Sequence, residues 1–141
     1  MSSLAKSEVH AFILAQRYGV VATTHADGST QSALVGIAVS PALEIYFDTT
    51  GDTRKAQNPR RDPRISLVIG WDNEQSIQLE GTADAPEGET LHDLKKIYFA
   101  AWPDGPSRES WPNITWFRVR PRWLRFSDFN RTADAVREMT F

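Results

Sequence analysis

The residues whose chemistry stands out lie in one short run, TTGDTRK, from Thr49 to Lys55. The hydroxyls of Thr49, Thr50 and Thr53 and the free backbone N–H groups can donate hydrogen bonds, and Arg54 and Lys55 add adjacent positive charges. If a helix begins here, its first turn contributes partial positive charge as well. A phosphate group needs this combination, so the run predicts a phosphate-binding site.

Two elements must position this run. The segment Leu43–Asp48, LEIYFD, alternates in polarity and predicts a strand that ends where the run begins. Thr53 or Asp52 can cap a short helix, and Pro59 is expected to end that helix within about two turns. The alternative interpretation is a solvated basic loop, because a helix N-terminus is a generic anion site.

The rest of the chain predicts mostly strands. Apolar spacing and turn residues predict an N-terminal helix after Ser7, strands over Gly19–His25, Thr30–Val39, Ile65–Trp71 and Gln75–Ala83, and a helix over Pro86–Ala101. After a proline-rich loop over Trp102–Asn113, we expect a final hairpin of Ile114–Val119 and Trp123–Phe126, broken at Pro121, and a short helix in the tail from Thr132. Short turns join the strands, so an antiparallel sheet that closes into a barrel with flanking helices is favoured over a doubly wound α/β fold.

Composition excludes several classes of protein. With 141 residues, the chain has the length of a single domain, which we expect to span 1–141. The chain contains no cysteine, which excludes disulfides, thiolate metal sites and cysteine nucleophiles. A net charge of -2 argues against binding to nucleic acid. No apolar run is long enough to span a membrane and Met1–Ser7 lacks the pattern of a signal peptide, so we expect a cytoplasmic protein.

Other reactive or charged side chains receive no site role. The arginines that follow the run are expected to be surface charges paired with Asp62 and its neighbours: Arg60, Arg61 and Arg64. The three histidines, at positions 10, 25 and 92, lack metal-ligand spacing and a nucleophile partner, and no metal site is predicted. The five tryptophans are expected to pack in the core or in a subunit interface. Glu80 lies on a strand and could act as a base, although a lone carboxylate is usually solvated.

Taken as a unit, YFDTTGDTRKAQNPRRDPRISLVIGW followed by QSIQLEGTA resembles the pyridoxamine 5′-phosphate oxidase-like family, the FMN-binding split β-barrels. In that family a strand ends in a hydroxyl-bearing turn, followed by a Ser/Thr-Arg-Lys triplet, a short helix, an Asn/Asp-Pro-Arg step and an apolar strand. The resemblance covers Tyr18 to about Asp84 well and Pro86–Phe141 more loosely. It implies a mainly β, antiparallel, Greek-key-like split β-barrel with flanking helices, and FMN as the cofactor.

The resemblance also implies roles for individual residues. Arg54 and Lys55 match the pair that binds the flavin phosphate, Thr53 matches the hydroxyl before them, and Thr49 matches the threonine at the strand end that also touches the cofactor. Thr50, in the same run, is a further candidate for cofactor binding. Two further positions match the start of the family strand whose Gln contacts FMN from the partner subunit: Gln75 and Ser76. Members of the family hold flavin at a dimer interface, so the resemblance implies a homodimer with two equivalent sites.

The departures from the family pattern bear on the substrate. True pyridoxamine-phosphate oxidases carry a basic strand residue that helps to hold the substrate phosphate, and the corresponding strand here, SALVGIAV, has neither Arg nor Lys. Pyridoxamine phosphate is therefore not expected as the substrate, and no catalytic residue is assigned. The segment Trp116–Arg125 is only a loose counterpart of the family's C-terminal Trp and Arg. Ser32 begins a small and apolar stretch whose backbone could lie along an isoalloxazine ring.

Three functions remain open from the sequence. The first is an FMN-dependent oxidoreductase acting on a small molecule that the sequence does not identify, in which the flavin performs the chemistry and the protein supplies binding and orientation. The second is a flavin-binding module without turnover, such as a stress or sensing protein. The third keeps the fold but uses deazaflavin F420 or haem, because related split barrels do so.

Overall fold

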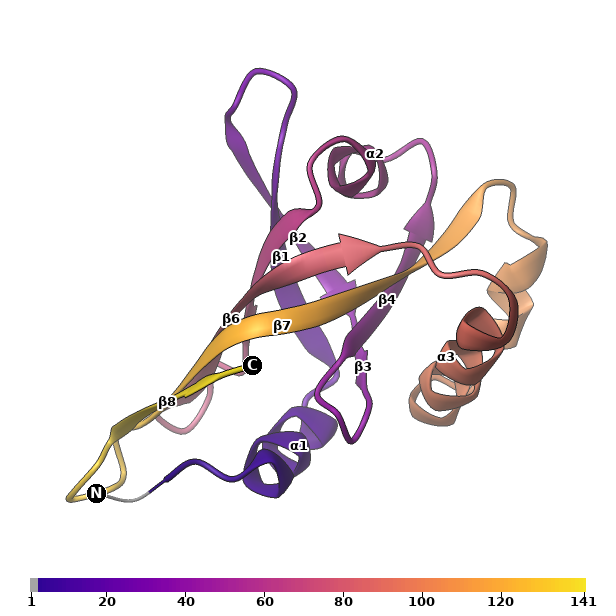
Figure 1. The fold of residues 1–141 in the computed structure, drawn as a ribbon. Helices are drawn as coiled ribbons and strands as arrows, with labels where there is room; N and C mark the ends of the chain where they lie inside the picture. The colour runs from indigo at the N-terminus through magenta and orange to yellow at the C-terminus, as the bar shows by residue number, and fades with distance from the viewer. Residues whose placement is uncertain (1–2) are drawn as a thin grey trace.

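The computed structural model describes residues 3–141, and its strands and helices follow in chain order (Figure 1). They are α1 (Lys6–Ala15), β1 (Tyr18–Thr24), β2 (Thr30–Gly36), β3 (Ala38–Val39), β4 (Ile45–Thr50), α2 (Arg54–Arg61), β5 (Arg64–Ile69), β6 (Gln75–Asp84), α3 (Gly88–Ala101), the 3₁₀ helix η1 (Gly105–Ser110), β7 (Ile114–Asp128) and β8 (Val136–Thr140).

All strand pairs are antiparallel and belong to one sheet in the order β2-β1-β5-β6-β7-β4-β3. The strand β8 pairs with the second half of β7, on the edge whose first half pairs with β4. The sheet curls into a half-barrel, with α2 and α1 toward its opposite ends and α3 to one side (Figure 1). The expected mainly β split barrel with flanking helices is confirmed.

Alternation along the strands builds two apolar clusters. Inside the barrel, Phe47 of β4 stacks on Phe117 of β7, and Val9 and Ile13 of α1 join the same cluster. Outside it, α3 packs over the other face of β4, where Tyr46 meets the helix. Burial on the two faces of β4 therefore fixes its register, because a slip by one residue would exchange the two sets of side chains.

The expected final hairpin is wrong. Instead of two strands broken at Pro121, the chain forms one strand, β7, of 15 residues. It pairs with β6 from Arg118 to Asp128, and a β-bulge near Gly81 and Pro121 absorbs the proline. A proline lacks the N–H that a ladder bond needs, and a bulge is a position where that loss is tolerated.

The expected helix in the tail is also wrong. Residues Val136–Thr140 form β8, which continues the sheet beside β7. Burial alternates there, with Arg137 buried between the exposed Val136 and Glu138, and the free edge of β7 offers a partner. Tertiary pairing, which a local pattern does not reveal, decides this segment.

Several boundaries differ from the expected ones by a few residues. The second expected strand is split, because Ile37 separates β2 from β3. Pro59 lies inside α2 rather than after its last residue, although the helix still ends two residues later and has only about two turns. Within the described residues, no helix is long and apolar enough to cross a membrane.

Candidate functional site

The run Thr49–Lys55, which the sequence predicts to bind phosphate, lies at the junction of β4 and α2. Thr53 occupies the N-cap position of α2, and Arg54 and Lys55 are the first two helical residues. The N–H groups of a first helical turn have no partner within the helix, and they carry the positive end of its dipole. Sequence and structure therefore agree that a helix begins directly before the two cations.

The side chains of Arg54 and Lys55 form no hydrogen bond or ion pair with any residue in 3–141. The other cations of this segment are engaged: Arg60 donates to Thr115, Arg61 donates to Asn58, and Arg64 donates to Asp62. Only the last of these is the expected pairing with Asp62. The two cations at the helix start are thus left available for an anion.

The threonine hydroxyls beside them are engaged with one another. The hydroxyl of Thr53 donates to the carbonyl oxygen of Thr50 at 2.8 Å and lies 2.9 Å from the hydroxyl of Thr49. Thr49 is buried and Thr53 is half-buried. These bonds hold the turn before α2 in place, so the threonines position the two cations as well as offering hydroxyl groups.

A cavity of about 200 Å³ joins the helix start to the edge of the sheet. Arg54 and Lys55 line one side, and Gln31, Ser32 and Ala33 of β2 line the other. The structure therefore brings Ser32 to the same cavity as the two cations, although more than 20 positions of sequence separate them.

The remaining predicted residues, Gln75 and Ser76, lie elsewhere. They begin β6 beside the end of β7, where the side-chain amide of Gln75 donates to Asp128 at 3.1 Å. That hydrogen bond is the main reason why the pKa of Asp128 is below its usual value. Neither residue lines the cavity at Arg54 in the single chain, and their contact with a cofactor of a partner subunit stays a prediction.

Asn58 is a residue of this site that the sequence analysis missed. Its side chain is fully buried, and its amide donates to the hydroxyl of Thr23 at 2.9 Å and to Gln31 at 3.1 Å. Its carbonyl oxygen accepts from the guanidinium of Arg61. These bonds fix α2 against β1 and β2, and the Asn-Pro-Arg step of the sequence is the signal that could have identified the residue.

A second polar network fixes the far side of β4. Asp48 accepts from the hydroxyl of Tyr98 on α3 and from the guanidinium of Arg108 on η1, each at 3.0 Å. Burial, and then the neighbouring Asp48 carboxylate, raise the pKa of Tyr98 far above its usual value. Because Asp48 directly precedes Thr49, this network holds the end of β4 from which the run Thr49–Lys55 begins.

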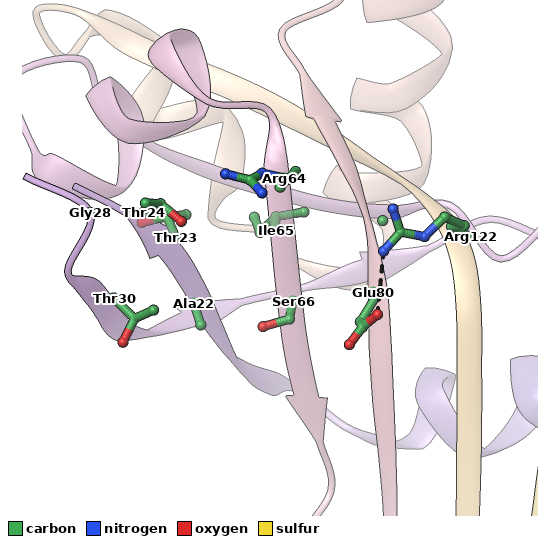
Figure 2. Close-up of a pocket in the computed structure, with 11 residues that line it drawn as sticks. Ala22, Thr23, Thr24, Gly28, Thr30, Arg64, Ile65, Ser66, Glu80 and Arg122 are labelled. Atoms are coloured by element: carbon green, nitrogen blue, oxygen red, sulfur yellow. Dashed lines mark hydrogen bonds and ion pairs between the residues drawn. The ribbon is translucent and has the colours of Figure 1, made fainter. Parts of the chain in front are cut away.

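Two further hollows continue from the first cavity across the open face of the sheet, which is the face that points away from the barrel core. One, of about 280 Å³, shares Ser32 with that cavity and reaches Trp123. The other, of about 430 Å³, shares Ala22, Ser66 and Glu80 with its neighbour. Figure 2 shows the larger hollow, where the carboxylate of Glu80 points toward the guanidinium of Arg122. The face thus offers a continuous groove from the start of α2 to β7.

The tryptophans are only partly where the sequence predicts them. Trp116 is buried beneath α3, and Trp102 packs beside the same cluster and donates its N–H to the carbonyl oxygen of Ile37. Trp71 and Trp111 are more than half exposed in the single chain. Burial in a core is confirmed for Trp116 alone, and interface burial of the exposed pair stays a prediction.

Comparison with known proteins agrees with the fold. The profile of the pyridoxamine 5′-phosphate oxidase family matches residues 5–128. This chain belongs to the pyridoxamine 5′-phosphate oxidase family.

Solved structures of similar fold carry several different names. A haem-binding protein from Mycobacterium smegmatis is similar with a TM-score of 0.82 and 18% identity, over 99% of this chain and 60% of that one. General Stress Protein 26 from Bacillus anthracis has a TM-score of 0.70 and 23% identity, over 86% of this chain and 92% of that one. HutZ, a haem storage protein from Vibrio cholerae, has a TM-score of 0.72 and 14% identity, over 82% of this chain and 89% of that one. At these identities the likeness shows a common fold, and this chain spans 60% of the length of the first protein.

Proposed function

We propose that this chain binds FMN and acts as a flavin-dependent oxidoreductase. The observation that carries the proposal is the pair of unpartnered cations at the start of α2, Arg54 and Lys55, which face a cavity shared with Ser32. A phosphate dianion fits this pair, because the side chains and the backbone N–H groups of Arg54 and Lys55 can all donate to it. When bound, FMN supplies the hydride or electron chemistry, and the protein supplies binding and orientation.

Haem is the alternative cofactor, since two of the similar structures are named as haem-binding or haem storage proteins. Haem iron needs an axial ligand such as His, Cys, Met or Tyr. The described residues that line the three adjoining hollows include none of these four types. His25 lines a fourth hollow, of about 370 Å³, which adjoins the largest of the three through Thr24, Gly28 and Arg64. The hollows nearest to Arg54 and Lys55 therefore favour a phosphate-bearing cofactor, flavin or F420, and a haem in the groove would need His25 as its ligand.

Pyridoxamine phosphate is not the substrate that the site favours. The strand β2 reads TQSALVG and, with Ile37 and β3, offers neither Arg nor Lys to a second phosphate. The similarity to a stress protein keeps open a flavin-binding role without turnover. A bound flavin that reduced nicotinamide and small electron acceptors fail to turn over would favour that role.

We further propose that the active form is a homodimer. On the open face of the sheet, Leu34 of β2, Val20 of β1 and Val68 of β5 are cross-strand neighbours, and they form an apolar row. Leu34 is 60% exposed and Val68 is 41% exposed in the single chain. A second copy placed on this row would bury it, and a site completed by the partner would give a role to Gln75 and Ser76.

The test of FMN binding is a titration of the flavin-free chain, followed by flavin fluorescence, with F420 and haem in parallel. The variant Arg54→Ala with Lys55→Ala loses charge-assisted hydrogen bonds worth about 1.5–3 kcal/mol each, so its FMN affinity is expected to fall by tens-fold or more. Arg60→Ala is the matched control, because Arg60 lies on the same helix but does not line the cavity. Equal FMN affinity in the folded double variant and the control would contradict the assignment.

A further inference from the structure

The β-bulge in β7 changes which side chains face the open side of the sheet. Before the bulge, Phe117 and Val119 point into the barrel; after it, Leu124 and Phe126 do. Inward positions are thus odd-numbered before the bulge and even-numbered after it. Regular alternation back from Leu124 would turn Arg122 into the core, and the bulge turns it outward instead.

Gly81 on the neighbouring strand makes this bulge possible. It pairs with Pro121 while Glu80 pairs with Trp123, which leaves Arg122 as the extra residue of β7. A Cβ atom on Gly81 would lie only 2.2 Å from the carbonyl oxygen of Arg120, so no larger residue fits without a shift of the backbone. The bulge is therefore built into both strands.

The bulge brings Arg122 beside Glu80 on the wall of the 430 Å³ hollow, where its guanidinium donates to the carboxylate at 3.3 Å (Figure 2). Both side chains remain more than half exposed. An exposed ion pair of this kind is weak, because water screens both charges and holding two flexible side chains costs entropy. A ligand can therefore open this pair at little cost.

The second arginine of the hollow is held differently. Arg64 forms two hydrogen bonds with the carboxylate of Asp62, at 3.0 and 2.6 Å, and these bonds lower the pKa of Asp62 to about 2. Arg64 thus meets its carboxylate through two hydrogen bonds, whereas Arg122 meets Glu80 through one, so the pair of Arg122 and Glu80 is the easier of the two to open. Glu80 and Arg122 are the charges free to exchange partners, above a floor that includes Ala22 and Ile65.

We propose that this hollow is a subsite for a small molecule that carries both a carboxylate and an amine, of the amino-acid type. Arg122 receives the carboxylate and Glu80 receives the ammonium group. A ligand with a single charge would break the ion pair and leave one partner uncompensated, whereas a ligand with both charges replaces one ion pair by two. As the subsite adjoins the groove of the proposed flavin site, its role as a substrate site rests on the proposed function.

The test uses three matched probes with the flavin-free full-length chain: L-phenylalanine, 3-phenylpropionate, which lacks the amine, and 2-phenylethylamine, which lacks the carboxylate. Binding is followed by ¹H–¹⁵N NMR shifts of the Gly81 and Ser66 amides and of the Arg122 side-chain N–H. We expect phenylalanine to bind about five- to tenfold more tightly than either half-ligand. Equal affinities for the three probes, or no shift at these residues, would overturn the inference.

Two variants test the roles of the Arg122 and Glu80 charges one at a time. Arg122→Gln is expected to reduce phenylalanine binding to the level of 2-phenylethylamine, and Glu80→Gln to the level of 3-phenylpropionate. Arg120→Gln is the control, because Arg120 is an exposed neighbour that pairs with Asp84 and does not line the hollow. Retention of wild-type phenylalanine affinity in Arg122→Gln would also overturn the inference.

Titration of the same samples with FMN separates this inference from the proposed function. Arg122→Gln is expected to keep its FMN affinity, and Arg54→Ala with Lys55→Ala is expected to keep phenylalanine binding. Loss of FMN binding alone would refute the flavin site and leave the subsite standing. Normal FMN binding without phenylalanine shifts would refute the subsite alone.

Discussion

Arg137 on β8 donates to both carboxylate oxygens of Glu8 on α1, at 3.0 and 2.6 Å, across 129 positions of sequence. The guanidinium is buried and the carboxylate is 41% exposed. This two-bonded pair attaches the last strand to the first helix, whose Val9 and Ile13 are part of the barrel core. The two ends of the described chain therefore stabilise each other.

This pair predicts a pH-dependent contribution to stability. The hydrogen bond from Arg137 holds the pKa of Glu8 below its ordinary value of 4.5. Because the folded-state pKa is depressed, the contribution is present above about pH 4.5 and is lost as the pH falls through the folded-state pKa. We expect Glu8→Gln to lower the free energy of unfolding at pH 7 by about 1 kcal/mol. The effect is modest because water screens the charge of the exposed carboxylate.

Urea unfolding of wild type and Glu8→Gln at pH 7 and at pH 3 measures this contribution. Ser7→Ala is a suitable control, because Ser7 is an exposed neighbour on the same helix. The difference between wild type and Glu8→Gln is expected to shrink at pH 3. A difference that is the same at both pH values would contradict an origin in the carboxylate charge.

Asn58 predicts a link between stability and cofactor binding. Asn58→Ala removes the buried hydrogen bonds to Thr23, Gln31 and Arg61 and leaves a small void. We expect it to lower the free energy of unfolding by about 2–4 kcal/mol. FMN affinity is also expected to fall, because α2 carries Arg54 and Lys55. Denaturant unfolding and flavin fluorescence measure the two effects, and Gln57→Ala, at an exposed position of the same helix, is the control.

The sequence predicts local elements and the phosphate-binding run, because both depend on contiguous residues. Thr53 before Arg54 and Lys55 specifies a helix start through local residues, independently of tertiary contacts. The apolar spacing of residues 88–101 specifies α3 in the same way. The sequence does not predict the elements that form only because they pair with strands distant in the sequence. The strand β8 forms because β7 offers it a free edge, and β7 remains one strand because Gly81 accommodates the bulge.

The candidate site likewise contains residues that the sequence predicts and residues that only the structure reveals. The two cations follow from their spacing, whereas the contribution of Gln31 depends on how α2 sits against β2. Arg122 lies in the expected break between the strands Ile114–Val119 and Trp123–Phe126, and only the bulge reveals that it faces the groove. Gln75 and Ser76 follow from the resemblance, and their contact with a cofactor stays a prediction because it requires the second subunit.

The close contact at Gly81 predicts that adding one methyl group there strongly lowers stability. Gly81→Ala would place a Cβ against the carbonyl oxygen of Arg120. That oxygen belongs to the backbone, so it cannot move away as the end of a flexible side chain can. We expect the free energy of unfolding to fall by about 2 kcal/mol or more. Thr82→Ala, on the exposed side of the same strand, is the control and is expected to change stability by less than about 0.5 kcal/mol. Thermal unfolding that is the same for both variants would contradict the close contact at the bulge.

The apolar row on the open face predicts how the chain associates. If Leu34, Val20 and Val68 meet a second copy, Val68→Asp would bury a carboxylate without a partner and break the dimer. Light scattering on a sizing column is expected to give the mass of a dimer for the wild type and of a monomer for the variant. Thr90→Asp introduces the same charge on the exposed surface of α3 and should remain a dimer. A Val68→Asp chain that dimerises as tightly as Thr90→Asp would place the interface on another face.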